Sequence, residues 1–456
     1  MPYTINTPAD QQAMLESIGV ASIEELFAGI PQELRVQRDL DLPAAKGELE
    51  LTQHMTQLAA KNLSADQATC FLGGGSYDHF IPAVVDAIAS RGEFYTSYTP
   101  YQPEVSQGNL QAMFEYQTLI CQLTGMDVSN ASLYDGGTAA LEAVLMCLAS
   151  AKGRNKVLVP ASVHPEYRQI LATNFANLNV EVVTLPTPDG CLELEQLESA
   201  LDDNTACVLI QHPNFFGCLE DVAAITDAAH KAGALVVQSF DPISLGILKR
   251  PGDFGVDVAV AEGQALGNPM AYGGPYLGIM ACREKFVRRM PGRIAGQTVD
   301  RRGKRCFVLT LQTREQHIRR EKATSNICTN QGLFALRSTI YMAAMGPNGL
   351  KRTAELCLHK ARYAAEQLTA NDRFELLFDQ PTFKEFVVRD RENNVPEALD
   401  NSLKKNIHGG IPLGQWYPEL EDCFLVAVTE KRTRQEIDQL AELINTTQAC
   451  ELTTYA

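Results

Sequence analysis

The sequence lacks long apolar runs and paired metal-binding cysteines. Its longest apolar stretch, residues 139–151, contains Glu142 and is too short to cross a bilayer. The first residues show neither the pattern of a signal peptide nor the Arg- and Ser-rich bias of a transit peptide, so we expect a cytoplasmic protein. The 12 cysteines form no Cys-x-x-Cys pair and have no histidine cluster beside them. This spacing excludes a disulfide framework and a zinc site, and we expect no bound metal.

Positive charge is also scarce. Lysine and arginine total 39 against 55 aspartate and glutamate residues, which gives a formal net charge of −16. Such a chain repels phosphate backbones, which argues against nucleic acid as a partner of the whole protein. The basic residues are unevenly spread, because residues 283–322 hold 13 of them with only 4 acidic residues. We call residues 283–322 the basic stretch and expect it to attract an anionic ligand or an acidic partner.

The length of 456 residues predicts two domains, since single cores stop growing near roughly 250–300 residues. Residues 1–65 have the pattern of a polar N-terminal arm made of amphipathic helices. We assign residues 66–330 to a large domain and residues 331–456 to a small C-terminal α+β domain.

Short β-branched or apolar runs alternate with amphipathic stretches after residue 66. Strands are predicted at 131–134, 156–160, 180–185, 206–211, 234–238, 256–261 and 278–281, and helices at 138–150, 166–175, 193–201 and 222–232. This alternation predicts an α/β fold with a mostly parallel sheet covered on both faces. The residues Gly273-Gly274-Pro275 predict a hairpin or a return at the sheet edge. In the small domain we expect helices at 332–345, 350–368 and 434–446 and strands at 374–378, 385–389 and 423–427.

Asp135, Gly136, Gly137 and Thr138 follow a predicted strand and open a predicted helix. Backbone N–H groups of the two glycines can approach an anion at a helix N-terminus, and the Thr138 hydroxyl can bond a phosphate oxygen. The alternative is an ordinary strand-to-helix turn capped by Asp135 or Thr138. His164 follows the next strand, at the sheet edge where α/β proteins bind ligands. An imidazole there either stacks on a flat cofactor or only caps its loop.

Residues 93–108 concentrate tyrosine, glutamine, proline and glutamate. Such a density of rigid, hydrogen-bonding groups indicates either a binding site or a surface loop that docks a partner, and both roles are compatible. We take the following side chains as candidate catalytic residues: Tyr95, Tyr98, Tyr101, Gln102, Glu104, Ser106 and Gln107.

No lysine occurs between Lys249 and Lys285, although a strand of the predicted sheet ends there. In a pyridoxal-phosphate enzyme of this fold, a Schiff-base lysine is expected just after that strand, and Gln264 cannot form an imine. Residues 311–321 alternate in charge, which is typical of a solvated helix face. Their continuity with the rest of the basic stretch instead favours a binding role.

Four strings identify a resemblance: Tyr-Thr-Pro-Tyr-Gln-Pro-Glu-Val-Ser-Gln-Gly at 98–108, Asp-Gly-Gly-Thr at 135–138, Gly-Gly-Pro-Tyr at 273–276, and Leu-Gln-Thr-Arg-Glu-Gln-His-Ile-Arg-Arg-Glu-x-Ala-Thr-Ser-Asn-Ile at 311–327. The chain resembles the glycine-cleavage P-protein (glycine decarboxylase) family over essentially its whole length. Within that family it looks like the first, or α, subunit of the two-subunit bacterial form.

The resemblance implies a fold-type I pyridoxal-phosphate transferase architecture. The family decarboxylates glycine with pyridoxal phosphate and transfers the aminomethyl group to the lipoyl group of the H carrier protein. The resemblance places the Schiff-base lysine at Gln264 and the aspartate that pairs with the pyridine nitrogen near Ser239, with Asp241 two residues further on. His164 matches the ring-stacking position, and residues 136–138 match the phosphate turn, as remains of an ancestral site.

This pattern implies that the chain binds no cofactor covalently. A β subunit partner is expected to bring the lysine and the cofactor, in a heterotetramer of two α and two β subunits, with no nucleic-acid or membrane partner. The candidates from Tyr95 to Gln107 would reach into a shared site that binds glycine or the lipoyl arm, and the basic stretch would steer the acidic carrier protein. Two alternatives are a stand-alone pyridoxal-phosphate amino-acid decarboxylase and a non-catalytic scaffold that kept the fold.

Overall fold

A computed structural model describes residues 5–445 except 152 and 324. The described part of the chain forms two compact units, one up to residue 62 and one from residue 63 onward. The first unit contains the helices α1 (Pro8–Ile18) and α2 (Glu48–Ala59) and the 3₁₀ turns η1 (Ile23–Phe27) and η2 (Gln32–Leu34). A reciprocal capping box between Thr7 and Asp10 begins α1. None of these four elements contains a buried residue, so this unit has no core of its own within the described residues.

The second unit is built on a seven-stranded sheet in the order β2-β8-β7-β6-β5-β3-β4. Its strands are β2 (Val128–Ser129), β3 (Lys156–Pro160), β4 (Glu181–Leu185), β5 (Thr205–His212), β6 (Leu235–Phe240), β7 (Val258–Glu262) and β8 (Gly278–Cys282). Five neighbouring strands are parallel, namely β3, β4, β5, β6 and β7. Strand β8 runs antiparallel to both β7 and β2. The predicted parallel sheet and the return near residues 273–275 are therefore confirmed.

The prediction of a strand at residues 131–134 is wrong. Only Leu133 makes an isolated bridge to Gly278, and the edge strand β2 lies three residues earlier. Ser132 has a φ of 109°, a left-handed conformation that interrupts strand pairing. The Asn130 side chain also accepts a hydrogen bond from the Ser132 amide, which turns the chain at this point.

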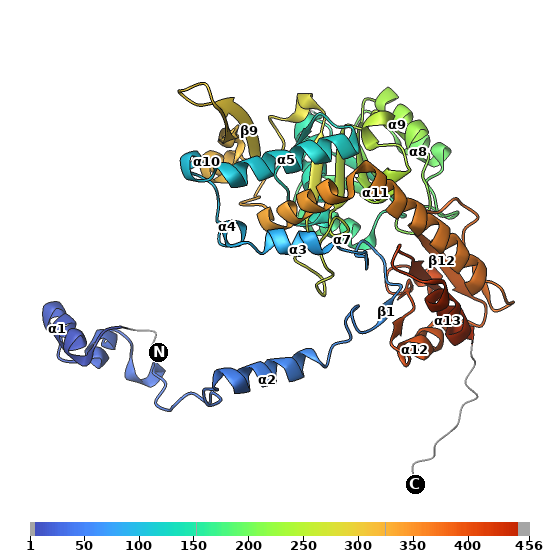
Figure 1. Ribbon diagram of the computed structural model, residues 1–456. Coiled ribbons are helices and arrows are strands. Elements are labelled where there is room, and N and C mark those ends of the chain that lie inside the picture. The colour runs from blue at the N-terminus through green and yellow to red at the C-terminus, as the bar shows by residue number, and fades with distance from the viewer. Residues whose placement is uncertain (1–4, 152, 324, 446–456) are drawn as a thin grey trace, which may run out of the picture. The chain divides into compact units, whose positions relative to one another are not determined.

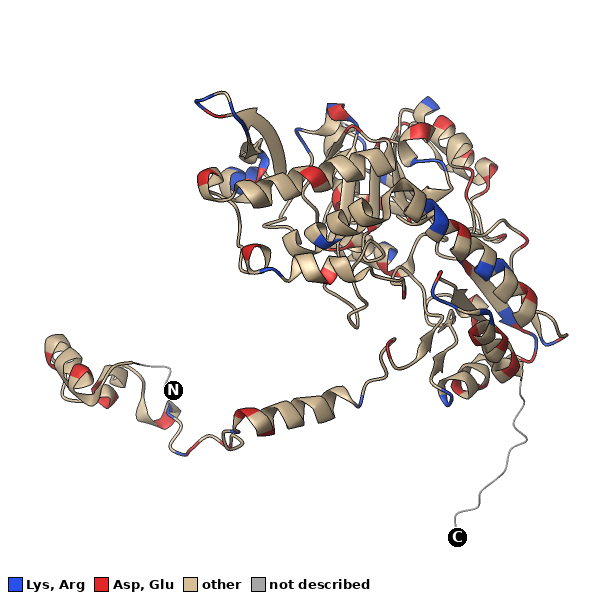
Figure 2. Cartoon of the chain, viewed as in Figure 1, with Lys and Arg blue, Asp and Glu red and all other residues tan. Residues whose placement is uncertain are grey.

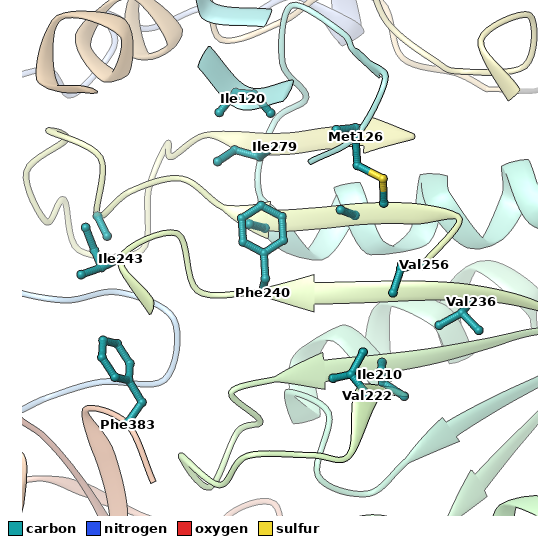
Figure 3. Packing of buried hydrophobic residues seen from close by; sticks show 14 of the residues in the cluster. Ile120, Met126, Ile210, Val222, Val236, Phe240, Ile243, Val256, Ile279 and Phe383 are labelled. Atoms are coloured by element: carbon teal, nitrogen blue, oxygen red, sulfur yellow. The ribbon is translucent and has the colours of Figure 1, made fainter. Parts of the chain in front are cut away.

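Alternating side chains of the sheet enter two separate cores. Leu158, Val208 and Val236 pack on one face under α3 (Ala83–Ala89), α5 (Gln107–Thr124), α9 (Val222–Lys231) and α11 (Gly332–Leu368). Figure 1 labels these helices, and Figure 3 shows Val236 in this core. On the opposite face, Val157 and Leu209 pack under α6 (Gly136–Ser150) and α7 (Pro165–Phe175). Consecutive residues point to opposite faces of a strand, so the buried runs serve both layers. The helix α8 (Leu194–Ala200) packs beside α9.

The helix α11 links the large domain to a small C-terminal domain (Figure 1). It kinks at Gly346, which has a φ of 58° and precedes Pro347. The small domain contains an antiparallel sheet in the order β11 (Phe374–Leu376), β12 (Glu385–Asp390), β15 (Cys423–Ala427), β14 (Ile411–Pro412), with helices α12 (Val395–Leu403) and α13 (Arg434–Asn445). The expected elements of this domain are confirmed, except that residue 446 lies outside the described residues.

Two pairings connect distant parts of the second unit. The short strand β1 (Thr69–Cys70) pairs in parallel with β13 (Ile407–His408) of the small domain. The strands β9 (Ile294–Val299) and β10 (Arg305–Thr310) form an antiparallel hairpin beside α5 (Figure 1), which the sequence did not predict. Residues 311–321, whose charges alternate, form no continuous helix. They contain α10 (Gln316–Arg319), a single turn between the 3₁₀ turns η7 (Gln312–Arg314) and η8 (Arg320–Lys322).

The remaining short elements are α4 (Gly92–Tyr95), η3 (Pro103–Val105), η4 (Ser244–Gly246), η5 (Pro251–Phe254), η6 (Glu284–Phe286) and η9 (Pro418–Leu420). Among the helices of the described residues, none combines the length and the apolarity that a membrane crossing requires.

Candidate functional site

The predicted phosphate turn forms a closed helix cap. The Asp135 carboxylate accepts a hydrogen bond of 2.7 Å from the Thr138 amide. In return, the Asp135 amide donates a hydrogen bond of 3.3 Å to the Thr138 hydroxyl. The Gly136 amide donates 2.9 Å to a carboxylate oxygen of Glu262. Two of the N–H groups at this helix N-terminus are thus bonded to side chains of the chain itself.

Glu262, at the end of β7, supplies the carboxyl group that closes this turn. Its carboxylate accepts hydrogen bonds from the amides of Gly136, Gln264 and Leu277 at 2.9–3.0 Å. Burial nevertheless raises the pKa of Glu262 to about 7, because the desolvation of the charge outweighs the three bonds. Sequence reasoning missed Glu262, although it stands directly before the segment that was searched for a lysine.

His164 caps α7 and stacks on Tyr167 of the same helix. The two ring centroids lie 4.7 Å apart at an interplanar angle of 16°, and Phe215 contacts the imidazole edge-on. The His164 Nδ1 accepts from the Glu166 amide, so its Nε2 carries the proton and donates 2.8 Å to the Gly74 carbonyl. Burial lowers the pKa of His164 to about 4, which keeps the ring neutral.

Gln264 is 2% exposed and fully hydrogen-bonded. Its Oε1 accepts 2.9 Å from the Tyr77 amide, and its Nε2 donates to the carbonyls of Tyr77 and Asn268 at 3.1 and 2.8 Å. The residue at the expected lysine position therefore joins two loops of the protein.

Asp241, two residues beyond Ser239, is paired with a lysine of the small domain. The Lys384 ammonium lies 2.5 Å from the Asp241 carboxylate and 3.3 Å from the centre of the Tyr77 ring. The adjacent Glu385 accepts from the Gly74 amide and the Tyr77 hydroxyl at 2.7 and 2.8 Å. Burial raises the pKa of Glu385 to about 7.

Two cavities remain at this edge of the sheet. A cavity of about 30 Å³ lies among residues that include His164, Ser239, Asp241 and Lys384, which is room for about one or two waters. A second cavity of about 930 Å³ is wider and shares Tyr77, His164, Tyr167 and Glu262 with the first. The group that the resemblance implies, pyridoxal phosphate, does not fit the residues present, because the amide of Gly136, the carboxylate of Asp241 and the amide side chain of Gln264 already have partners in the chain.

The candidate segment from Tyr95 to Gln107 lines neither of these two cavities. Five of its candidate side chains are exposed, namely Tyr95, Tyr98, Tyr101, Gln102 and Glu104. Tyr98 is 90% exposed. The side chains of Tyr98, Gln102 and Glu104 make no hydrogen bond or ion pair with any residue that the structure describes.

Two other candidates of this segment face the protein. Gln107 exchanges two hydrogen bonds of 2.8–2.9 Å with the backbone of Phe307 in β10, which fixes the segment to the β9–β10 hairpin. Ser106 is half-buried at the start of α5 and makes no side-chain capping bond there. The seven candidates thus separate into an exposed group and a group at the foot of α5.

Arg293 connects two of the strings that carry the resemblance. It is buried, donates a hydrogen bond of 3.0 Å to the Tyr101 hydroxyl in the first string, and lies 4.0 Å from the Glu315 carboxylate in the second. It also donates to the Thr329 hydroxyl at 2.7 Å. His317 packs edge-on against Tyr101 at 6.2 Å. Residues 98–108 and 311–327, far apart in sequence, therefore lie side by side. Sequence reasoning missed Arg293, because nothing in the sequence distinguishes this arginine from the other basic residues of the basic stretch.

The basic stretch divides into structural and exposed arginines. Arg283, Arg289 and Arg314 donate to backbone carbonyls that include Gly252, Ala149 and Met290. Others are exposed, and in Figure 2 basic residues mark the loop of the β9–β10 hairpin and the region of α10. The exposed set is Lys285, Arg288, Arg301, Arg302, Lys304, Arg305, Arg319, Arg320 and Lys322.

Comparison with known proteins identifies the family. The sequence model described as glycine cleavage system P-protein matches residues 2–444. The chain is 54% identical over 444 residues to the probable glycine dehydrogenase (decarboxylating) subunit 1 of Carboxydothermus hydrogenoformans, which covers 97% of this chain and 99% of that protein. The corresponding protein of Desulforamulus reducens is 52% identical over 442 residues, 97% of this chain and 98% of that one.

Solved structures agree. A crystal structure of glycine decarboxylase (P-protein) in inhibitor-bound form has a TM-score of 0.88 at 42% identity and covers 97% of this chain and 99% of that one. A sphingosine-1-phosphate lyase of Burkholderia pseudomallei, 16% identical with a TM-score of 0.65, covers 92% of this chain and 93% of its own, and it shows the fold alone. The expected fold-type I architecture is confirmed, and the chain belongs to the glycine cleavage system P-protein family, which depends on pyridoxal phosphate.

Proposed function

We propose that this chain is the α subunit of a two-subunit glycine decarboxylase, active in the cytoplasm together with a catalytic β subunit. The relatives that match nearly its whole length are named as subunit 1 of that enzyme. In this proposal the β subunit carries the Schiff-base lysine and the pyridoxal phosphate. The assembly is a heterotetramer of two α and two β subunits that decarboxylates glycine and passes the aminomethyl group to the lipoylated H carrier protein.

The observation that carries the proposal is that Gln264 is buried and hydrogen-bonded at the position expected for the Schiff-base lysine. At the position where the fold requires a lysine, the chain has a buried amide whose donor and acceptor both have backbone partners. A stand-alone pyridoxal-phosphate decarboxylase needs an amine at this point to hold its cofactor, and it is therefore the weaker alternative.

The exposed group of the tyrosine segment is what this chain offers to the shared site. Tyr98, Gln102 and Glu104 have hydroxyl, amide and carboxylate groups without partners in the described part of the chain, so they are available to bond an external molecule. Hydrogen bonds from Arg293 to Tyr101 and from Gln107 to Phe307 fix the backbone of the segment, so these exposed groups are held in defined positions. We propose that they contact glycine or the lipoyl arm in the partner's site.

The exposed arginines and lysines of the basic stretch are proposed to steer the acidic H carrier protein. Nine of them are exposed, and the rest of the chain has an excess of acidic residues, so this surface has a local excess of positive charge. A local field of this kind raises the rate of encounter with an oppositely charged partner.

Reconstitution tests the proposal. Glycine-dependent exchange of carbon dioxide should require this chain and the β subunit together, and neither should support it alone. A scaffold role predicts that turnover continues when this chain is omitted. A stand-alone decarboxylase predicts that the isolated chain with added cofactor shows an imine absorbance band that borohydride removes. Either of these results would contradict the proposal.

A further inference from the structure

We propose that this chain fills the cofactor pocket of its fold with two of its own side chains and so excludes pyridoxal phosphate altogether. Tyr167 takes the place of the cofactor ring, and Glu262 takes the place of its phosphate. The inference concerns the isolated chain, and it does not depend on which subunit performs the chemistry.

The ring position is filled by Tyr167. His164, the residue that would stack on a flat cofactor, is already stacked on Tyr167 at 4.7 Å and 16°. Both residues lie at the start of α7, three positions apart, which places side chains on the same helix face. The bond from His164 Nε2 to the Gly74 carbonyl and the edge contact of Phe215 fix the imidazole in this orientation. A cofactor ring would have to displace the Tyr167 phenol.

The phosphate position is filled by Glu262. An anion is favoured at a helix N-terminus, and here the carboxylate of Glu262 supplies it by accepting from the Gly136 amide at 2.9 Å. A single carbon added to Gly136 would lie 2.2 Å from the Tyr167 hydroxyl and 2.8 Å from the Glu262 amide. A carbon added to Gly137 would lie 2.5 Å from the Ile170 side chain. The two glycines are thus packed closely against Tyr167, Glu262 and Ile170. A phosphate that bonded the Gly136 amide would have to displace the Glu262 carboxylate.

The remaining wall is closed from the small domain. Lys384 pairs with Asp241 at the end of β6, and Glu385 bonds the Gly74 amide and the Tyr77 hydroxyl. Between these groups lies the cavity of about 30 Å³, which holds about one or two waters. Tyr167 and Glu262 also line the wider cavity of about 930 Å³, so a cofactor that entered from that side would still have to displace these two side chains. Side chains that once could have contacted a cofactor now connect the large domain, the loop at 73–77 and β12.

Opening the pocket tests the inference. The double variant Tyr167→Ala/Glu262→Ala removes both stand-ins, and Tyr363→Ala/Glu366→Ala on α11, which lines neither cavity, is the matched control. Binding of pyridoxal phosphate is followed by equilibrium dialysis and by quenching of Trp416, the sole tryptophan. Trp416 lies 5.7 Å from Phe215, whose ring contacts His164, so it reports on the pocket.

We expect no saturable binding to the natural chain or to the control. The double variant should gain saturable binding, which inorganic phosphate reverses by competition. Saturable binding to the natural chain that His164→Ala abolishes would overturn the inference, and so would a folded double variant that binds no cofactor.

A second measurement covers the case in which the double variant does not fold. Tyr167→Ala alone leaves a ring-shaped space against His164, and p-cresol copies the missing side chain. We expect p-cresol to raise the melting temperature of Tyr167→Ala by several degrees and to leave the natural chain unchanged, because only the variant has the empty ring position. Equal shifts in the two proteins would show that Tyr167 does not occupy such a position.

Discussion

The ammonium group of Lys384 lies 2.5 Å from the carboxylate of Asp241, and this ion pair joins the small domain to the end of β6. Lys384 is only 1% exposed, so its charge depends on this partner. Lys384→Met should reduce the free energy of unfolding by about 3–5 kcal/mol, because it leaves Asp241 buried without a counter-charge. The double variant Lys384→Met/Asp241→Asn should lose much less. Urea denaturation of the four proteins measures the coupling, and additive losses would show that the pair is not coupled.

The raised pKa of Glu385 predicts that the free energy of unfolding depends on pH. Burial raises its pKa to about 7 from the ordinary value of 4.5, so the folded protein holds this proton more tightly than the unfolded chain does. Its stabilising contribution is complete below pH 4.5 and is lost as the pH rises through 7. Relative to the natural chain, Glu385→Gln should therefore gain about 2–3 kcal/mol between pH 5 and pH 8. Thermal unfolding across this range measures it, with the exposed Glu198→Gln as a control that shows no such trend.

Tyr98 and Glu104 are predicted to act in the shared site. Tyr98→Phe and Glu104→Gln should each lower glycine turnover of the assembled complex by about 10-fold, the loss expected for one hydrogen bond to a charged group. Their exposure means that the fold and the assembly should not change, which gel filtration checks. Tyr363→Phe is the control. Unchanged turnover in both variants would remove this segment from the shared site.

Arg293 is predicted to position the tyrosine segment without contacting substrate. Arg293→Lys keeps the charge but loses the fork that bonds the Tyr101 and Thr329 hydroxyls together. We expect lower turnover together with faster proteolysis at residues 98–108. Tyr101→Phe removes only one acceptor and should give a smaller effect of the same kind. Normal protease resistance in Arg293→Lys would contradict the positioning role.

The exposed loop of the β9–β10 hairpin is predicted to steer the carrier protein. Arg301→Glu/Arg302→Glu should slow aminomethyl transfer by about 10-fold at low salt and flatten its dependence on ionic strength. Glycine-dependent carbon dioxide exchange at saturating carrier should change far less. Arg352→Glu/Arg362→Glu, two exposed changes on α11 that alter the net charge equally, is the control. A rate that is independent of ionic strength in the natural complex would rule out steering.

The local pattern of this sequence determined most of the large domain. The strand at 156–160 and the helix at 222–231 were readable because apolar periodicity and caps act between neighbouring residues. The β9–β10 hairpin could not be predicted in this way, because its strands are polar on one side and are stabilised by hydrogen bonds from Gln107 and Gln117 of α5. The strand expected at 131–134 failed because the Asn130 side chain and the left-handed Ser132 redirect the backbone, which periodicity does not register.

By itself, the sequence determined the family, the parallel sheet and the missing lysine at Gln264, since these depend on residue identity and local order. Only the tertiary structure decided what occupies the pocket. Tyr167, Glu262 and Lys384 come from three separate segments, and their roles depend on distances of a few ångströms across the fold. Packing and hydrogen bonding between residues remote in sequence set those distances, and no one-dimensional pattern records them.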